Sequence, residues 1–117
     1  PAQAKIERSP ETARYVQLAA ISPRAAIIEV WLAVESAAIT ALSALYTSPP
    51  IESLRYSHQL GKWLKDSNLV DDAQYDIFQR LRELRNKAAH ADELTLTERD
   101  AVQYVELALA LASHLSK

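Results

Sequence analysis

The sequence predicts an all-α protein, a single five-helix bundle, on the strength of three observations. The 117 residues include one glycine, whereas tight β-hairpins and Gly-rich phosphate loops both need glycine's positive φ. Alanine and leucine, which favour helices, are abundant. Helix-start signals recur between segments with helical apolar spacing. A chain of this length forms one domain with a sizeable core.

The helical domain is expected to cover residues 9–117, after a patternless tail at residues 1–8. Ser9-Pro10 and Ser22-Pro23 each place a hydroxyl before a proline, which is the order that starts a helix. The expected helices run from about 10 to 21, 23 to 46, 51 to 65, 71 or 72 to 90, and 97 to 115.

The starts of the last two helices depend on acidic residues. Asp71 or Asp72 can cap the fourth helix, and its first turn is acidic. Thr97, with Asp100 three residues later, resembles a capping box. Both signals predict short connections between neighbouring helices.

The second helix is apolar on nearly every side, so it is either central to a bundle or inside a membrane. Glu29 and Glu35 lie within it, and each would cost about 2.5–3.5 kcal/mol near a bilayer centre. We therefore expect a central helix with no membrane contact, with one face in the core and one against another subunit. Trp31 and Trp63 are expected to be core or interface aromatics.

Composition excludes several classes of site. The formal net charge of -2 gives no global basic field, so any nucleic-acid binding must be local. The chain has no cysteine, which removes disulfide and thiolate chemistry and fits a cytoplasmic location. It also has no methionine, so we interpret it as a fragment or processed form. The missing part could carry a membrane anchor or a partner domain.

The fourth helix carries the candidate site. Arg82, Asn86 and His90 follow one another at intervals of four and share one face. Arg85 lies at the edge of an expected buried stripe, about 140° around a regular helix from His90. The two side chains can converge if the last turn unwinds, if the arginine wraps round, or if a second copy supplies one of them. The stripe consists of Ile77, Leu81, Leu84 and Ala88.

These residue types suit phosphate chemistry. A guanidinium group can donate two hydrogen bonds to the oxygens of one phosphate, and an imidazole can accept or donate a proton near neutral pH. Together they supply what metal-free RNA cleavage needs. The alternative is a solvated cationic face at a helix C-terminus, which the helix dipole favours. The cluster consists of Arg80, Arg82, Arg85 and Lys87, against one acid, Glu83.

Residues 81–90, LRELRNKAAH, resemble the signature of the HEPN superfamily, the higher-eukaryote and prokaryote nucleotide-binding domains. Arg85, Asn86 and His90 match its motif of an arginine, a polar residue and a histidine, with four residues between arginine and histidine. The proline-initiated apolar helix with an internal acid and the Thr-capped last helix also match. The resemblance extends from about Ser9 to Leu115 and is closest to a small bacterial branch of unknown function.

The resemblance implies a homodimer in which two motifs face each other across a cleft. Many relatives are metal-independent endoribonucleases in toxin–antitoxin, phage-defence or RNA-processing systems. Arg85 and His90 would then carry catalysis with support from Asn86, without a cofactor, and would leave a 2′,3′-cyclic phosphate. Partners would be RNA or a nucleotide, a second copy, and an antitoxin or another domain of a longer chain. Other HEPN domains are non-catalytic dimerisation or nucleotide-binding modules.

The remaining ionisable side chains have simpler interpretations. Arg80, Arg82 and Lys87 are candidate phosphate contacts. Glu35 or Glu29 either forms a salt bridge within the bundle or orients Arg85. His58 and His114 lack metal-ligand spacing, and His114 is expected to be exposed. Tyr104 on the last helix either borders the cleft or packs in the core, and core packing is the favoured interpretation.

Overall fold

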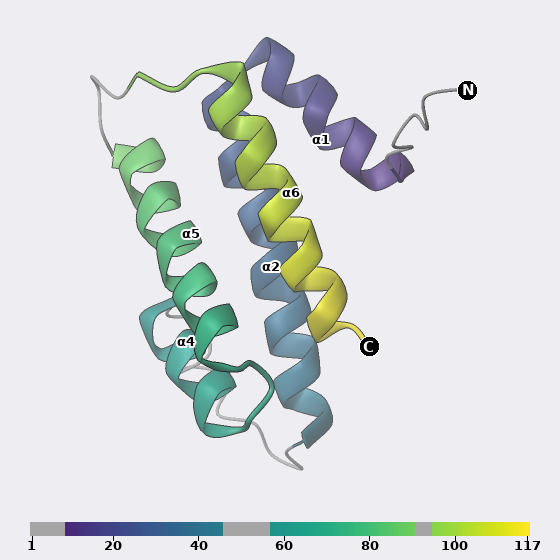
Figure 1. Cartoon of the computed structure of the whole chain (residues 1–117), viewed down its shortest axis with the longest axis vertical. Coiled ribbons are helices and arrows are strands. Elements are labelled where there is room, and N and C mark those ends of the chain that lie inside the picture. The colour runs from purple at the N-terminus through teal and green to yellow at the C-terminus, as the bar shows by residue number, and fades with distance from the viewer. Residues whose placement is uncertain (1–8, 46–56, 91–94) are drawn as a thin grey trace.

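The structure, a computed structural model, describes residues 9–45, 57–90 and 95–117 (Figure 1). Within these ranges it contains five α-helices and no strand, so the predicted all-α five-helix bundle is confirmed there. The expected beginning of the third helix, residues 51–56, lies outside the described residues, as do the tail at 1–8 and part of the connector after His90. The helices are α1 (Pro10–Ile21), α2 (Pro23–Leu45), α4 (Ser57–Asp66), α5 (Asp72–His90) and α6 (Glu98–Leu115).

The two Ser-Pro signals start helices as predicted. The backbone N–H of Thr12 donates to Ser9 Oγ at 3.1 Å, and that of Ala25 donates to Ser22 Oγ at 3.1 Å. Each bond satisfies an amide that a helix leaves unpaired in its first turn. Ser22 thus ends α1 and begins α2 with one residue between them.

Reciprocal caps start α5 and α6. Asp71, the first of the two candidate acids, caps α5: Gln74 N–H donates to Asp71 Oδ1 at 2.7 Å and Asp71 N–H to Gln74 Oε1 at 2.9 Å. The predicted capping box of α6 is confirmed, since Asp100 N–H donates to Thr97 Oγ1 at 3.0 Å and Thr97 N–H to Asp100 Oδ2 at 3.2 Å. These caps fix where both helices begin.

The end of α4 turns on Asn68, the one described non-glycine residue with positive φ, at 58°. Leu69 N–H donates to Leu64 O and Asn68 N–H to Lys65 O, both at 3.0 Å. This pair of bonds is a Schellman motif, which needs a left-handed residue that asparagine tolerates. The motif reverses the chain so that α5 packs beside α4.

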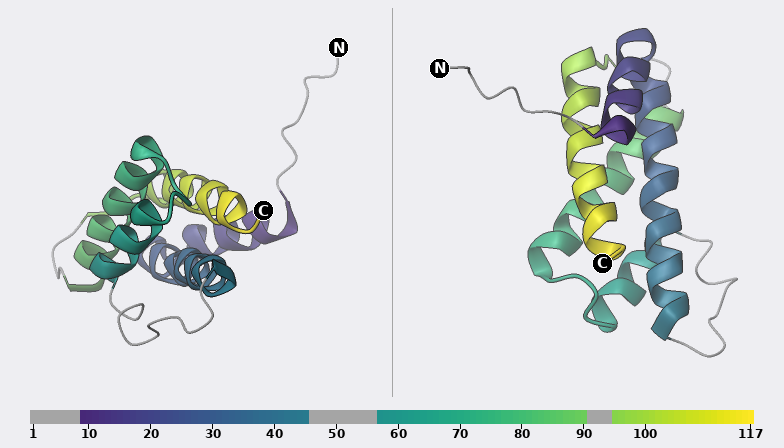
Figure 2. Two further views of the ribbon diagram at one scale, coloured as in Figure 1. Left: turned by 90° about the horizontal axis from the view of Figure 1, so that it is seen from below. Right: turned by 90° about the vertical axis from the view of Figure 1, so that its right-hand side faces the viewer.

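Helix α2 is the centre of the bundle and contacts the other four described helices. Figure 2 shows α2 and α6 running alongside each other with α1 across their upper part. The Trp31 ring packs against Phe78 of α5 with 5.1 Å between ring centroids. The largest fully buried side chains are Trp31, Phe78, Ile27, Leu42, Leu60, Leu64, Val30, Val34 and Val105.

By length and composition alone, α2 is also apolar enough to cross a membrane, with a mean hydropathy of 1.7 over its best window. The core helix of a compact bundle passes the same test, because it too is apolar on most sides. In the structure 39% of that window is buried against the other helices.

Gly61 explains how closely α4 approaches α5. A Cβ at this position would lie 3.0 Å from the Phe78 ring and 3.1 Å from Gln79 Oε1. Phe78 is fully buried and cannot move aside freely. We expect Gly61→Ala to lower the free energy of unfolding by about 1 kcal/mol, because overpacking outweighs the gain in helix propensity. Urea unfolding measures this, with the exposed Lys62→Ala as the control; a Gly61→Ala chain more stable than wild type would contradict the contact.

Candidate functional site

The buried face of α5 differs from the expected stripe. Phe78, Leu81 and Ala88 are buried, whereas Ile77 and Leu84 are only half-buried. The face is rotated because Phe78 packs against Trp31 of α2 and Gly61 of α4. Arg85 follows Phe78 by seven residues and Leu81 by four, so it is on the same side of the helix as these two residues, where it is half-buried.

Two arginines of α5 keep unmet donors in the interior. Arg85 Nη1 donates to Asn86 Oδ1 at 3.2 Å, but its Nε is buried without a hydrogen-bond partner among the described residues. The Nε of half-buried Arg82 is in the same state. A buried donor without an acceptor is unfavourable, so an anion or a water that reached either nitrogen would be stabilised.

Arg85 belongs to a polar cluster formed by three helices. Burial raises the pKa of Tyr104 on α6 far above its usual value; Arg85 lowers it and Glu35 raises it. Both charges act on one phenol, so Glu35 of α2 and Arg85 of α5 lie within electrostatic reach of Tyr104. Tyr104 is buried as predicted. The sequence does not predict these neighbouring charges, nor the hydrogen bond that the Tyr104 hydroxyl donates to Leu81 O at 2.8 Å.

The shifted phenol predicts a pH dependence of stability. An unfolded tyrosine ionises near pH 10, whereas the pKa of folded Tyr104 is raised. The neutral phenol therefore contributes fully below about pH 10, and its contribution falls by up to about 1.4 kcal/mol per pH unit above it. We expect Tyr104→Phe to lose less stability than wild type between about pH 9 and pH 11 in urea unfolding. Parallel pH curves for the two proteins would contradict this.

His90 is exposed and is the last residue of α5. The helix is regular through it, so the last turn does not unwind to bring His90 toward Arg85. About 140° of helix rotation separates them, and Asn86, which holds the Arg85 side chain, is half-buried between the two positions. Within one chain the structure therefore joins Arg85 to Asn86 but not to His90.

The other four predicted residues lie in four different places. Lys87 is exposed on α5, and Arg80 lines a groove between α5 and α6. Of the two acids in α2, Glu35 is near Tyr104 and Arg85, whereas Glu29 is exposed in a separate groove beside α1. Glu29 is therefore not the acid that orients Arg85.

The prediction that His114 is exposed is wrong. It is half-buried and not exposed, because its Nε2 lies 2.9 Å from Leu69 O and so ties the end of α6 to the turn before α5. The side chain of His58 lies outside the described residues. Trp31 is buried and Trp63 packs against the core, as predicted. Within residues 9–45, 57–90 and 95–117, no group of three or more His, Asp or Glu side chains is arranged to hold a metal ion.

Comparison with known protein families, curated proteins and solved structures finds no match to this chain. The candidate site therefore stands on its own residues: a half-buried arginine with an unmet donor, its asparagine partner, and an exposed histidine at the end of the same helix.

Proposed function

We propose that this chain is a HEPN-type domain that cleaves RNA without a metal ion, in a composite site formed by two copies. The observation that carries the proposal is the Arg85–Asn86 pair, in which a half-buried guanidinium is held in place by a hydrogen bond from its Nη1. A phosphate oxygen is the natural acceptor for such a group. No RNA or second copy is needed to hold the arginine in place.

The proposal needs a second copy because Arg85 and His90 do not meet within one chain. His90 is exposed at the end of a regular helix, on a different side from Arg85. Two copies that meet along this part of α5 would place His90 of one beside Arg85 of the other. A two-fold interface creates two such sites from one pair of surfaces.

The residues then have distinct roles. His90 accepts the proton of the ribose 2′-hydroxyl as the 2′-oxygen attacks the neighbouring phosphorus. Arg85 stabilises the charge that develops on the phosphate oxygens. The 5′-oxygen leaves and takes up a proton, so the products are a 2′,3′-cyclic phosphate and a 5′-hydroxyl. Arg82, which is half-buried, binds a flanking phosphate together with the exposed Lys87, while Glu35 positions Arg85.

The experiment is incubation of the purified chain with structured and unstructured RNA in excess EDTA. We expect cleavage that EDTA does not inhibit and products that end in a cyclic phosphate. No cleavage of either RNA, or cleavage that EDTA abolishes, would remove the proposal. A His114→Ala chain is the histidine control, because His114 binds Leu69 O at the other end of the molecule.

A second candidate is a non-catalytic dimerisation or nucleotide-binding module of a longer protein. The separation of Arg85 and His90 on one helix favours it, because binding needs only the guanidinium whereas catalysis needs both groups. Titration with a nucleoside triphosphate distinguishes the two: binding that Arg85→Ala removes, in a chain that leaves RNA intact, would support the module.

A further inference from the structure

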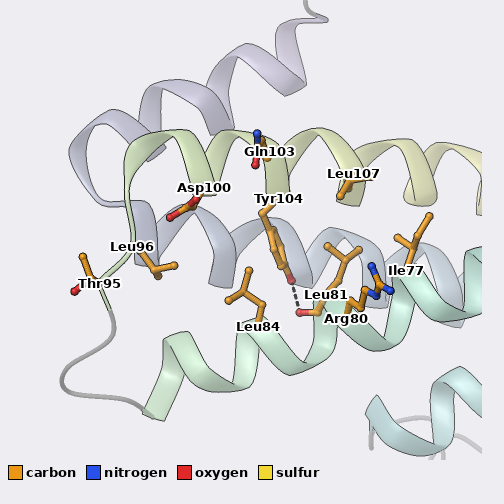
Figure 3. Close-up of a pocket in the computed structure, with 10 residues that line it drawn as sticks. All are labelled: Ile77, Arg80, Leu81, Leu84, Thr95, Leu96, Asp100, Gln103, Tyr104 and Leu107. Atoms are coloured by element: carbon orange, nitrogen blue, oxygen red, sulfur yellow. Dashed lines mark hydrogen bonds between the residues drawn. The ribbon is translucent and has the colours of Figure 1, made fainter.

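The groove between α5 and α6 is not used by the proposed site. It has a volume of about 610 Å³ and a largely apolar wall (Figure 3). Ile77 and Leu84 of α5 are only half-buried in it, and Leu107 of α6 remains 50% exposed. The Tyr104 hydroxyl points to Leu81 O, which leaves the ring to form part of the wall. The groove therefore leaves apolar surface of Ile77, Leu84 and Leu107 that a partner would cover.

Charge distinguishes the two ends of the groove. Figure 3 shows Arg80 beside Ile77 and Leu107 at one end, and Asp100 beside Leu96 at the other. The cap of α6 uses Oδ2 of Asp100, and the residue remains exposed. Asp100 and Leu107 are seven residues, or about 10 Å, apart along α6, so the groove presents a carboxylate at one end and an arginine at the other.

A surface with one basic and one acidic end is complementary to itself. A two-fold axis across the groove places the basic end of one copy against the acidic end of the other, and does so twice. We propose that this groove is a self-association surface, in which a second copy of the chain covers Leu84 and Leu107 and pairs its Asp100 with Arg80.

This inference does not rest on the proposed function. Leu84 and His90 lie about 120° apart around α5, so the groove and the Arg85–His90 site use different sides of the helix. If both surfaces pair, the wild-type chain forms a four-chain assembly; if only the groove pairs, it forms a dimer. Breaking the groove halves the molar mass in either case.

The test is a charge exchange, with molar mass measured by light scattering at micromolar concentration. Arg80→Glu alone and Asp100→Lys alone each place like charges at both contacts, so we expect each to have half the wild-type mass. In an equimolar mixture both contacts become attractive again, and we expect the wild-type mass to return. The control is Arg99→Glu with Glu106→Lys, which reverses two exposed charges of α6 outside the groove and should leave the mass unchanged.

Three outcomes would overturn the inference: a wild-type chain with the mass of one copy, an Arg80→Glu chain that keeps the wild-type mass, or single variants that dissociate but do not reassociate on mixing. Asp100 also caps α6, so circular dichroism checks the fold of its variant. If helicity is lost, Gln103→Lys on the same wall takes its place. RNA cleavage by Arg80→Glu is measured separately and reports only on the proposed function.

Discussion

Replacing His90 with alanine is expected to reduce EDTA-resistant RNA cleavage by about 10²- to 10⁴-fold, which is the usual contribution of a general base. His90 is exposed and no tertiary contact of its side chain is part of the described structure, so the thermal unfolding midpoint should stay within a degree or so of wild type. Cleavage kinetics with a labelled RNA measure the loss.

Arg85→Lys is the companion variant. It keeps the positive charge near Glu35 and Tyr104 but removes the fork that binds Asn86 and a phosphate. We expect a loss of about 10²- to 10³-fold, whereas Arg99→Lys, on the exposed surface of α6, should have no effect. If His90→Ala cleaves as fast as wild type, His90 is not the base and the catalytic proposal is wrong.

Replacing Trp31 with alanine is expected to lower the free energy of unfolding by about 3–5 kcal/mol. Trp31 is fully buried on the central helix and packs on Phe78, so the substitution leaves a cavity between α2 and α5. Its Nε1 has no hydrogen-bond partner among the described residues. Trp31→Phe should therefore cost much less, because it removes an unsatisfied donor together with part of the ring.

Denaturant unfolding compares these chains with Leu32→Ala, the matched control on the same helix. Leu32 is half exposed, so its truncation should change the stability by no more than about 0.5 kcal/mol. Equal losses for Trp31→Ala and Leu32→Ala would mean that α2 is not packed as the structure has it.

The helix starts could be predicted from the sequence because capping is local. Ser9, Ser22 and Thr97 each bond an amide three residues later, and such contacts are encoded within one turn. The sequence allows either Asp71 or Asp72 as the cap of α5, since both acids precede the same apolar segment. Gln74, which completes the box with Asp71, is the residue that decides it.

What the sequence missed depends on tertiary packing. Of the predicted stripe, Leu81 and Ala88 are buried, whereas Ile77 and Leu84 only pack against the core from its margin. Phe78, which is outside the stripe, is fully buried because Gly61 leaves room for its ring. That rotation leaves Arg85 half-buried and the α5–α6 groove partly apolar. His114 was expected to be exposed because its acceptor, Leu69 O, is 45 residues away in the chain. A periodicity within one helix contains no information about such partners.

The most direct test of the shared site is complementation between two inactive chains. Arg85→Ala lacks the guanidinium and His90→Ala lacks the imidazole, but a mixed pair keeps one site that takes each group from a different copy. After mixing and exchange of subunits, random pairing should restore about a quarter of wild-type cleavage. If wild type cleaves RNA and the mixture cleaves no faster than the two variants assayed apart, the two groups do not meet across an interface, and the proposed composite site is contradicted.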